Sequence, residues 1–176
     1  TPSTKPPFAR AAAQIAGNTQ VVPNPNALTN KIVYAGTSAA AANDQSGFYI
    51  SRNGGVSFNG LSLQDTTISA LLDVTPSPEG DALFLAHSDA VAVGNPESLW
   101  KSTSAPLGAT WERVDALICA ANTAIARVDP GYQTTKAAYL AEIGGANTIH
   151  FSTDGGDIWA IRFAPAAIID LLVESK

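Results

Sequence analysis

A turn-like segment recurs three times along the chain at a spacing of about fifty residues, and this period constrains the fold more than any other feature of the sequence. The first copy runs from Ser51 to Phe58, the second from Ser102 to Trp111 and the third from Ser152 to Trp159. Each copy opens on serine, contains glycine and ends on an aromatic residue. A fixed period of this length is typical of repeat architectures, in which each repeat is one supersecondary unit.

Each period predicts four β-strands, because four apolar or aromatic runs of strand length are separated by clusters of Gly, Pro, Asn and Ser. The runs of the first period are Val21–Pro25, Ile32–Gly36, Gly47–Ile50 and Phe58–Leu61. Those of the second are Leu72–Pro78, Ala82–Ala86, Ser98–Lys101 and Trp111–Val114, and those of the third are Arg127–Pro130, Ala137–Ala141, Thr148–Phe151 and Trp159–Arg162. Helical periodicity is weak, and the best helix candidates are the short alanine-rich stretches 11–13 and 39–42. Four antiparallel strands without crossover helices favour a propeller blade over a parallel solenoid.

The recurring turns resemble Asp-box (BNR) repeats, whose consensus is S-x-D-x-G-x-x-W. The third copy matches all four positions, whereas the second carries two extra residues before its glycine. The residues at the consensus positions are Ser51, Asn53, Gly55 and Phe58, then Ser102, Ser104, Gly108 and Trp111, then Ser152, Asp154, Gly156 and Trp159. Such repeats occur in the propellers of sialidases, xyloglucan hydrolases, sortilin-type receptors and a photosystem assembly factor. The resemblance covers essentially the whole chain and implies an all-β propeller.

The chemistry of the box favours a structural role. An Asp or Asn at the third position can accept hydrogen bonds from backbone amides of its own turn. Glycine tolerates positive φ at no steric cost, and the final aromatic offers a large apolar surface to the space between adjacent sheets. The resemblance further implies that the box joins the third and fourth strands of a blade, at the rim opposite the ligand site.

The spacing predicts three complete blades flanked by parts of two others. We expect blades at residues 15–61, 62–116 and 117–164, an outer strand of a preceding blade and a linker at 1–14, and the first strand of a following blade at 165–176. Phe8 supports the preceding strand, because it has the position of a box aromatic. Propellers close with roughly four to eight blades, so three blades predict either a piece of a larger propeller or several copies that complete a ring. The absence of Met favours the piece.

Composition excludes several classes of protein. The net charge is −5 and the 10 basic residues are scattered singly, which disfavours nucleic-acid binding. No apolar run is long enough for a transmembrane helix. Cys119 is the single cysteine and is expected to be a small buried side chain. The scarcity of Lys, the abundance of Ala, Ser, Thr and Asn, and the repeat family together suggest an exported, extracellular or cell-surface prokaryotic protein.

If the geometry of the family holds, one rim carries the loops between second and third strands and the loops between blades. Ionisable residues that we expect on these exposed loops are Asp44, Asp65, His87, Asp89, Glu97, Asp115 and Glu142. Paired carboxylates on such a rim could act as acid and base in glycoside cleavage, and Asp65, Asp89 and Glu142 are the candidates for that role. The same residues are also what solubility alone requires of exposed loops.

Sialidase chemistry and metal binding are poorly supported. A sialidase needs an arginine triad, whereas only Arg127 lies on a predicted inner strand, where it is expected to pair with Asp129 or Asp73. His150 occupies the slot of an aromatic residue and is expected to pack, and His87 with Asp89 would supply only two metal ligands. No cofactor and no metal are expected.

Three functions remain as hypotheses. The first is a non-catalytic structural or binding module within a larger exported Asp-box propeller, in contact with the rest of that propeller or with other subunits through its open edges, and with carbohydrate as a candidate ligand. The second is a fragment of a xyloglucanase-like or sialidase-like glycoside hydrolase that uses rim carboxylates. The third is an oligomer that closes a propeller ring.

Overall fold

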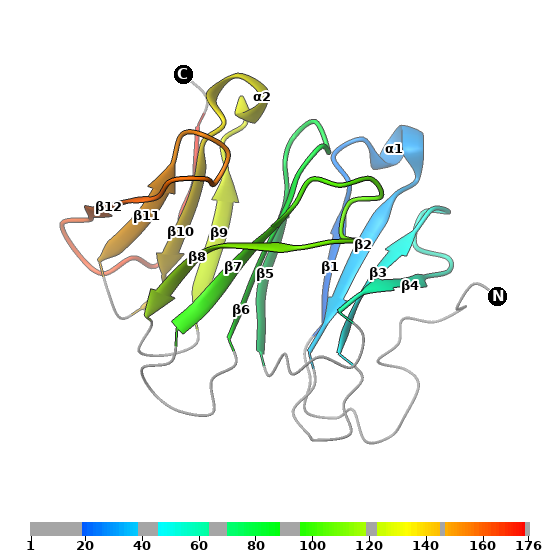
Figure 1. Cartoon of the computed structure of the whole chain (residues 1–176), viewed down its shortest axis with the longest axis horizontal. Coiled ribbons are helices and arrows are strands. Elements are labelled where there is room, and N and C mark those ends of the chain that lie inside the picture. The colour runs from blue at the N-terminus through cyan, green and yellow to red at the C-terminus, as the bar shows by residue number, and fades with distance from the viewer. Residues whose placement is uncertain are drawn as a thin grey trace.

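Three four-stranded antiparallel sheets make up the protein in a computed structural model, which describes residues 19–38, 46–63, 70–88, 96–118, 123–144 and 147–174. Within each sheet, every strand pairs with its neighbour in sequence (Figure 1). Blade 1 contains β1 (Thr19–Pro23), β2 (Val33–Thr37), β3 (Gly47–Ser51) and β4 (Asn59–Ser62). Blade 2 contains β5 (Ala70–Pro76), β6 (Leu83–Ser88), β7 (Pro96–Ser102) and β8 (Glu112–Ile118). Blade 3 contains β9 (Ala124–Val128), β10 (Ala138–Glu142), β11 (Thr148–Ser152) and β12 (Ala160–Phe163). The predicted all-β class is confirmed.

The first strand of each blade is the innermost one. β1 contacts β5, and β5 contacts β9, so the three sheets stand side by side with these strands adjacent (Figure 1). The fourth strands, β4, β8 and β12, form the outer edges of the sheets. This arrangement is that of consecutive blades around a common axis.

Apolar side chains fill the two spaces between the blades. Because successive residues of a strand point to opposite faces, a sheet between two neighbours must be apolar on both. In β6, Leu83 and Leu85 pack with Tyr34 and Phe48 of blade 1, whereas Phe84 packs with the core shared with blade 3. The run Ala82–Ala86 is therefore buried continuously and does not alternate between apolar and polar residues.

Two short helical turns were not predicted from the sequence. They are α1 (Ala27–Asn30) and α2 (Tyr132–Thr135), and each joins the first and second strands of its blade. Asx–Pro pairs at the same relative position, Asn24–Pro25 and Asp129–Pro130, precede them. The Asn24 and Asp129 side chains accept hydrogen bonds from backbone N–H groups two residues on, at 2.9 and 2.6 Å, which starts each turn. The predicted helix candidates 11–13 and 39–42 lie outside the described residues.

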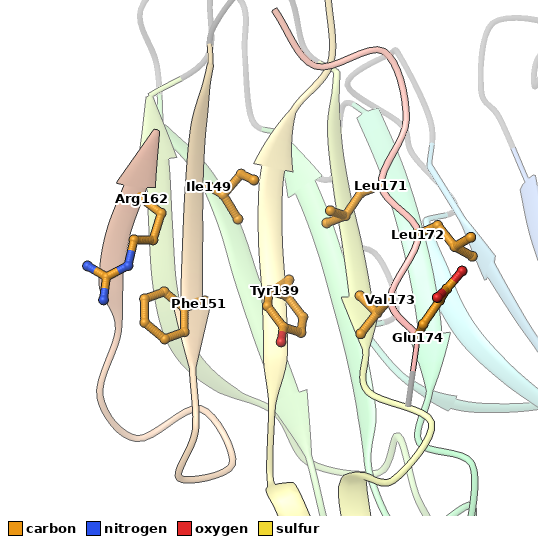
Figure 2. Close-up of a pocket in the computed structure, with 8 residues that line it drawn as sticks. All are labelled: Tyr139, Ile149, Phe151, Arg162, Leu171, Leu172, Val173 and Glu174. Atoms are coloured by element: carbon orange, nitrogen blue, oxygen red, sulfur yellow. The ribbon is translucent and has the colours of Figure 1, made fainter. Parts of the chain in front are cut away.

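The segment after blade 3 does not form the predicted strand. Residues 164–174 are irregular, because a strand needs a ladder of hydrogen bonds to a partner and this segment is held differently. The Gly144 N–H donates to the Ile168 carbonyl at 2.7 Å, and Ile168 is buried against Ile125 and Ala141 of blade 3. Residues 171–174 then cross the free face of blade 3 (Figure 2). The predicted outer strand around Phe8 lies outside the described residues.

Candidate functional site

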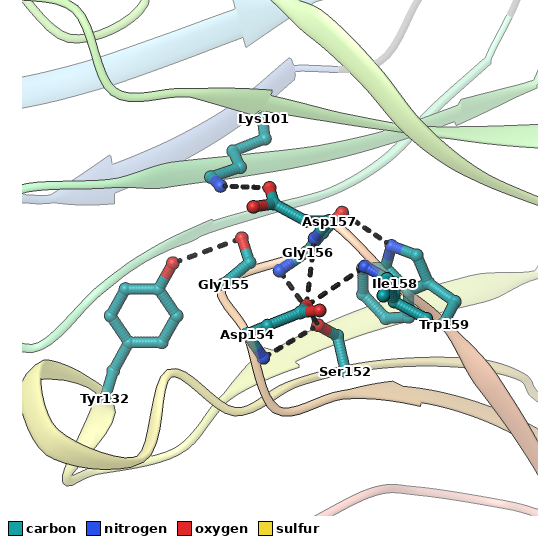
Figure 3. A network of polar contacts seen from close by, with 9 residues as sticks. All are labelled: Lys101, Tyr132, Ser152, Asp154, Gly155, Gly156, Asp157, Ile158 and Trp159. Carbon is teal, nitrogen blue, oxygen red and sulfur yellow. Dashed lines mark hydrogen bonds and ion pairs between the residues drawn. The ribbon is translucent and has the colours of Figure 1, made fainter.

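The third recurring turn is closed by its own side chains (Figure 3). The Ser152 hydroxyl accepts the Gly156 N–H at 2.8 Å and donates to Asp154 Oδ1 at 2.7 Å. The same carboxylate oxygen accepts the N–H groups of Asp157 and Ile158, both at 3.0 Å. The Ser152 hydroxyl, followed by these backbone amides, lowers the pKa of Asp154 from its ordinary value.

The other two turns share part of this network. In the first, the Ser51 hydroxyl accepts the Gly55 N–H at 2.9 Å, and Asn53 Oδ1 accepts the Ser57 N–H at 2.9 Å. In the second, the Ser102 hydroxyl accepts the Gly108 N–H at 2.8 Å. The glycine is in the left-handed region in all three turns, at φ values of 89°, 84° and 101° for Gly55, Gly108 and Gly156.

The second and third turns pack on the preceding blade. Gly108 lies against Phe48 of blade 1, so closely that a Cβ atom built at Gly108 would be 2.2 Å from the ring. Trp111 meets the same ring edge-on, with centroids 5.0 Å apart, and its Nε1 donates to the Ser62 hydroxyl at 3.0 Å. Ser62 in turn donates to the Gly108 carbonyl. These contacts tie blade 2 to blade 1.

Turn 3 makes the corresponding contacts with blade 2. Trp159 packs on the core between blades 2 and 3, and its Nε1 donates to the Gly156 carbonyl at 2.9 Å. Lys101 of β7 forms an ion pair with Asp157 at 3.4 Å (Figure 3). Tyr132 of α2 contacts Phe84 edge-on, and burial, followed by the negative charges of Asp81, Asp157 and Glu79, raises the pKa of Tyr132 to about 12.

At the opposite edge of the sheets, the predicted exposed rim is wrong for three residues. His87, Glu97 and Glu142 are only 8%, 0% and 2% exposed. The reason is strand length: β6 continues to Ser88, β7 begins at Pro96 and β10 continues to Glu142, so these residues lie on paired strands between blades. The other predicted rim residues Asp44, Asp65 and Asp89 lie outside the described residues, as does Cys119.

His87 belongs to the interface between blades 1 and 2. Its ring stacks on Trp100 with centroids 5.9 Å apart and an interplanar angle of 15°. The Trp100 indole N–H is buried and has no hydrogen-bond acceptor within the described part of the chain.

A histidine–carboxylate pair crosses the interface between blades 2 and 3. His150 Nδ1 on β11 lies 2.7 Å from Asp115 Oδ2 on β8, and both side chains are largely buried. We expected His150 to pack as an aromatic residue and Asp115 to lie in an exposed loop. His150 is buried, as expected, and in addition contacts a carboxylate. The expectation for Asp115 is wrong, because β8 extends through Asp115 and presents it to blade 3.

The innermost strands carry a second ion pair, which confirms one of the two predicted partners of Arg127. Arg127 Nη1 donates to Asp73 Oδ2 at 2.6 Å, joining β9 to β5. Asp73 also accepts the backbone N–H groups of Ala126 and Val74, at 3.0 and 2.9 Å. A pocket of about 350 Å³ surrounds this pair, with Leu72, Thr123, Ala124, Ile125 and Ile143 as its other lining residues.

A groove of about 380 Å³ lies on the free face of blade 3 (Figure 2). One wall consists of Tyr139, Ile149, Phe151 and Arg162, and the other of residues 171–174. The Arg162 guanidinium stacks 4.9 Å from the centroid of Phe151. Arg113 and Arg162 lie on the outer strands β8 and β12, which correspond to the predicted runs Trp111–Val114 and Trp159–Arg162.

Four of the acidic side chains that the structure describes are buried or paired with a cationic or histidine side chain. Glu97 and Glu142 are buried, Asp115 pairs with His150, and Asp73 pairs with Arg127. Among the described residues there is no group of three or more His, Cys, Asp or Glu side chains arranged to hold a metal ion. The helices in the described ranges are too short to cross a membrane.

Sequence signals could have located part of this site. The Asx–Pro pairs recur with the same spacing to the following Lys, at Asn24 and Lys31 and at Asp129 and Lys136, and mark the helical turns that support the recurring turns. The Gly54 and Gly155 N–H groups donate to the Lys31 and Lys136 carbonyls, each at 2.8 Å. No comparable sequence signal marks the pair between His150 and Asp115.

Comparison with known proteins places the fold. No family model matches the chain. Over 113 residues, or 63% of its length, the chain is 30% identical to a xyloglucanase of a Paenibacillus species, of which it spans 10%. It superposes on the GH74 xyloglucanase from Xanthomonas campestris with a TM-score of 0.63 and 20% identity, covering 93% of the chain and 25% of that enzyme. It superposes on a GH74 enzyme from Niastella koreensis with a TM-score of 0.56 and 20% identity, covering 82% of the chain and 22% of that enzyme.

The three sheets are therefore blades of a β-propeller, as their shape and order indicate. The chain spans a quarter or less of each of these proteins. Its sequence similarity to a xyloglucanase covers nearly two thirds of its own length.

Proposed function

We propose that the chain supplies three blades to a larger, exported Asp-box propeller that binds xyloglucan-type β-glucan, and that its own contribution is structural and binding rather than catalytic. The observation that carries this proposal is the 30% identity to a Paenibacillus xyloglucanase, on a chain whose sheets have the order of propeller blades. Extracellular location is part of the proposal, because its polymeric substrate class cannot enter a cell.

The turn chemistry supports the Asp-box assignment. Serine, acid and glycine of the third turn are joined by hydrogen bonds within eight residues, and the final aromatic packs towards the preceding blade. The first turn repeats this with Asn53 as acceptor. Groups engaged in this way stabilise the turn and are not available to a ligand, which favours a structural role for this edge.

The pocket around Arg127 and Asp73 is the candidate sugar contact. It lies between the innermost strands of blades 2 and 3 and combines a guanidinium donor and a carboxylate acceptor with apolar walls from Leu72, Ile125 and Ile143. Sugar-binding sites need few but well-placed polar groups among apolar surface. Because the charges of Arg127 and Asp73 compensate each other, the pocket has no net charge from this pair, and a neutral glycan is a suitable ligand.

Affinity electrophoresis tests this proposal. The full chain is expected to migrate more slowly in gels that contain xyloglucan than in gels that contain an unbranched cellulose derivative. Arg127→Ala should abolish the retardation, whereas Arg162→Ala removes the same charge away from the pocket and should preserve it. Equal migration of the unmodified chain in gels with and without xyloglucan would reject xyloglucan binding.

Glycoside hydrolysis is the second candidate function, and the same similarity to a xyloglucanase favours it. In this alternative Asp65 and Asp89 would act as acid and base, since Glu142 is buried. Release of reducing ends from xyloglucan by the chain, lost in Asp65→Asn and in Asp89→Asn, would establish catalysis. Retardation without release of reducing ends would support the binding role.

A further inference from the structure

The outer strand of blade 3, β12, exposes two apolar side chains to solvent. Ile161 and Phe163 are 52% and 73% exposed and lie two residues apart along the edge of the sheet (Figure 1). Directly opposite residues of antiparallel strands share a face of the sheet. Ile161 lies opposite His150, which contacts Asp115 of blade 2. Ile161 and Phe163 therefore lie on the face that is directed towards blade 2, and not on the free face of blade 3.

The corresponding positions of blade 2 show that this exposure does not depend on a missing neighbour. Blade 2 packs against blade 1 on one face and against blade 3 on the other. The residues two and four positions before the opening serine of turn 3 pair with Ile161 and Phe163, and those before the serine of turn 2 pair with Arg113 and Ala116. Arg113 and Ala116 are both exposed. A blade with two neighbours thus leaves these positions open to solvent, and in blade 3 they are apolar.

The pairing of β12 is also more regular than that of the other outer strands. Residues 160–163 pair one to one with residues 151–148 of β11. A register shift interrupts the pairing of β4 with β3, and another interrupts that of β8 with β7. Bulges and charged side chains protect an exposed edge from pairing with another strand. β8 has both kinds of protection, whereas β12 has a regular register and exposed apolar residues.

The backbone of β12 can form further hydrogen bonds at the same two residues. The Ala164 N–H donates to the Asn147 carbonyl at 2.7 Å, so these two residues form a hydrogen-bonded pair. Hydrogen-bonded and non-hydrogen-bonded pairs alternate along antiparallel strands. Phe163 and Ile161 are therefore in non-hydrogen-bonded pairs with β11, and their own N–H and C=O groups point away from it. Among the strands of the described residues, none pairs with this edge.

We propose that β12 is a docking edge that binds an extended segment of another protein as an additional antiparallel strand. An extended strand offers N–H and C=O groups at the two-residue interval that Ile161 and Phe163 require. Its side chains at the two paired positions lie on the face of Ile161 and Phe163, so they should be apolar. The residue between them lies opposite Arg162 and should be acidic. This interaction goes beyond the proposed function and does not depend on sugar binding.

A second copy of β12 fits this edge less well. If two copies paired antiparallel with Ile161 opposite Phe163, the two Arg162 side chains would lie directly opposite each other. Like charges in this arrangement are destabilising. An acidic residue at the centre of the docked segment replaces this repulsion with attraction, which is why the proposed occupant has the order apolar, acidic, apolar.

Fluorescence anisotropy with a short labelled peptide in which valine and glutamate alternate tests the proposal on the full chain. The unmodified chain is expected to bind the peptide. Ile161→Ser should weaken binding about threefold through the lost side-chain pair. Val21→Ser is the matched control, because Val21 is also an apolar strand residue with 52% exposure, and it should leave binding unchanged. Ile161→Pro also removes the outward N–H and should weaken binding about tenfold or more.

Variants of the peptide test the strand geometry. N-methylation at the valines removes the N–H groups that point towards β12 and should abolish binding. N-methylation at the glutamates alters N–H groups that point away from β12 and should preserve binding. Replacement of glutamate by lysine should weaken binding, because lysine would lie opposite Arg162. Circular dichroism and urea unfolding verify that every protein variant is folded, which is expected of Ile161→Pro because the N–H of Ile161 is not part of the ladder with β11.

Four results would overturn the proposal. They are the absence of peptide binding by the unmodified chain, equal binding of the two N-methylated peptides, equal losses in Ile161→Ser and Val21→Ser, and a dimer of the chain that Ile161→Pro dissociates. The last of these would assign the edge to a second copy.

Discussion

Gly108→Ala is expected to be the most destabilising glycine-to-alanine substitution in the recurring turns. Gly108 has φ at 84°, and a Cβ atom there would lie 2.2 and 2.6 Å from two ring atoms of Phe48. The left-handed conformation costs a residue with a Cβ atom about 1–2 kcal/mol. Overpacking against a buried ring adds about 1–3 kcal/mol, because Phe48 is fully buried and has nowhere to move. We expect a total loss of about 2–5 kcal/mol from these two terms.

The other turns provide matched controls for the steric term. Gly55 occupies the same position in turn 1 with φ at 89°, and a Cβ atom there meets nothing within 4 Å. Gly156 has φ at 101° and only ordinary contacts, at 3.5 Å or more. Gly55→Ala and Gly156→Ala should therefore lose only the conformational term, about 1–2 kcal/mol.

Urea unfolding of dilute protein, followed by tryptophan fluorescence, measures these differences. Trp111 packs on Phe48 and reports directly on the affected junction. The slope of free energy against urea should stay the same across the series, so that the midpoint reflects stability. Phe48→Leu in the Gly108→Ala background should recover part of the loss, giving a coupling between neighbouring sites. Equal losses for Gly108→Ala and Gly55→Ala would refute the argument that turn 2 is wedged against blade 1.

Three further outcomes follow from the polar contacts of turn 3. Ser152→Ala should lower the free energy of unfolding by about 1–3 kcal/mol, because it leaves the buried Gly156 N–H without its acceptor. Thr153→Ala, at the next position, is the control and should have little effect. The midpoints of urea unfolding measure both changes. Folding lowers the pKa of Asp154, so its ionised side chain contributes to the free energy of unfolding above the ordinary carboxyl pKa, and this contribution is lost as pH falls through the lowered pKa. Asp154→Asn should therefore reduce the dependence of stability on pH in the acid range. An unchanged dependence would contradict this. Because folding raises the pKa of Tyr132 from 10.0 to about 12, its stabilising contribution is complete below pH 10 and is lost between pH 10 and 12. Burial raises the pKa of Tyr34 as well, so tyrosinate absorbance should show more than one late-titrating group, and one of them should disappear in Tyr132→Phe.

The repeat predicted the blades because the same local chemistry recurs in each period. Strand-length apolar runs, glycines and the final aromatics are short-range signals, and each predicted run overlaps a strand of the three sheets, although the runs for β8 and β9 miss the centres of those strands. The strand ends were less predictable, because pairing continues for as long as a partner strand is available. This is why Glu97 and Glu142, which seem to belong to loops, are buried on strands.

Contacts between blades were the hardest to predict. His150 shares its slot with Tyr49 and Trp100, so the alignment predicted packing, but what the slot faces depends on the neighbouring blade. In blade 3 that neighbour presents Asp115, and a hydrogen-bonded pair results. Arg127 was easier, since one carboxylate lay two residues away in sequence and another on the neighbouring inner strand, and the structure selects Asp73.

Turns 2 and 3 each pack on an aromatic ring of the preceding blade, and this packing has a consequence for the order in which the blades unfold. Phe48 of blade 1 lies against turn 2 and Phe84 of blade 2 lies against turn 3, so blades 1 and 2 each provide an aromatic ring that supports the turn of the next blade. Stability in such a row is a sum of unit and nearest-neighbour contributions. Unfolding of blade 1 should therefore destabilise turn 2 and Trp111 of blade 2 while blade 3 stays folded. Thermal unfolding should begin at one end of the row and proceed blade by blade.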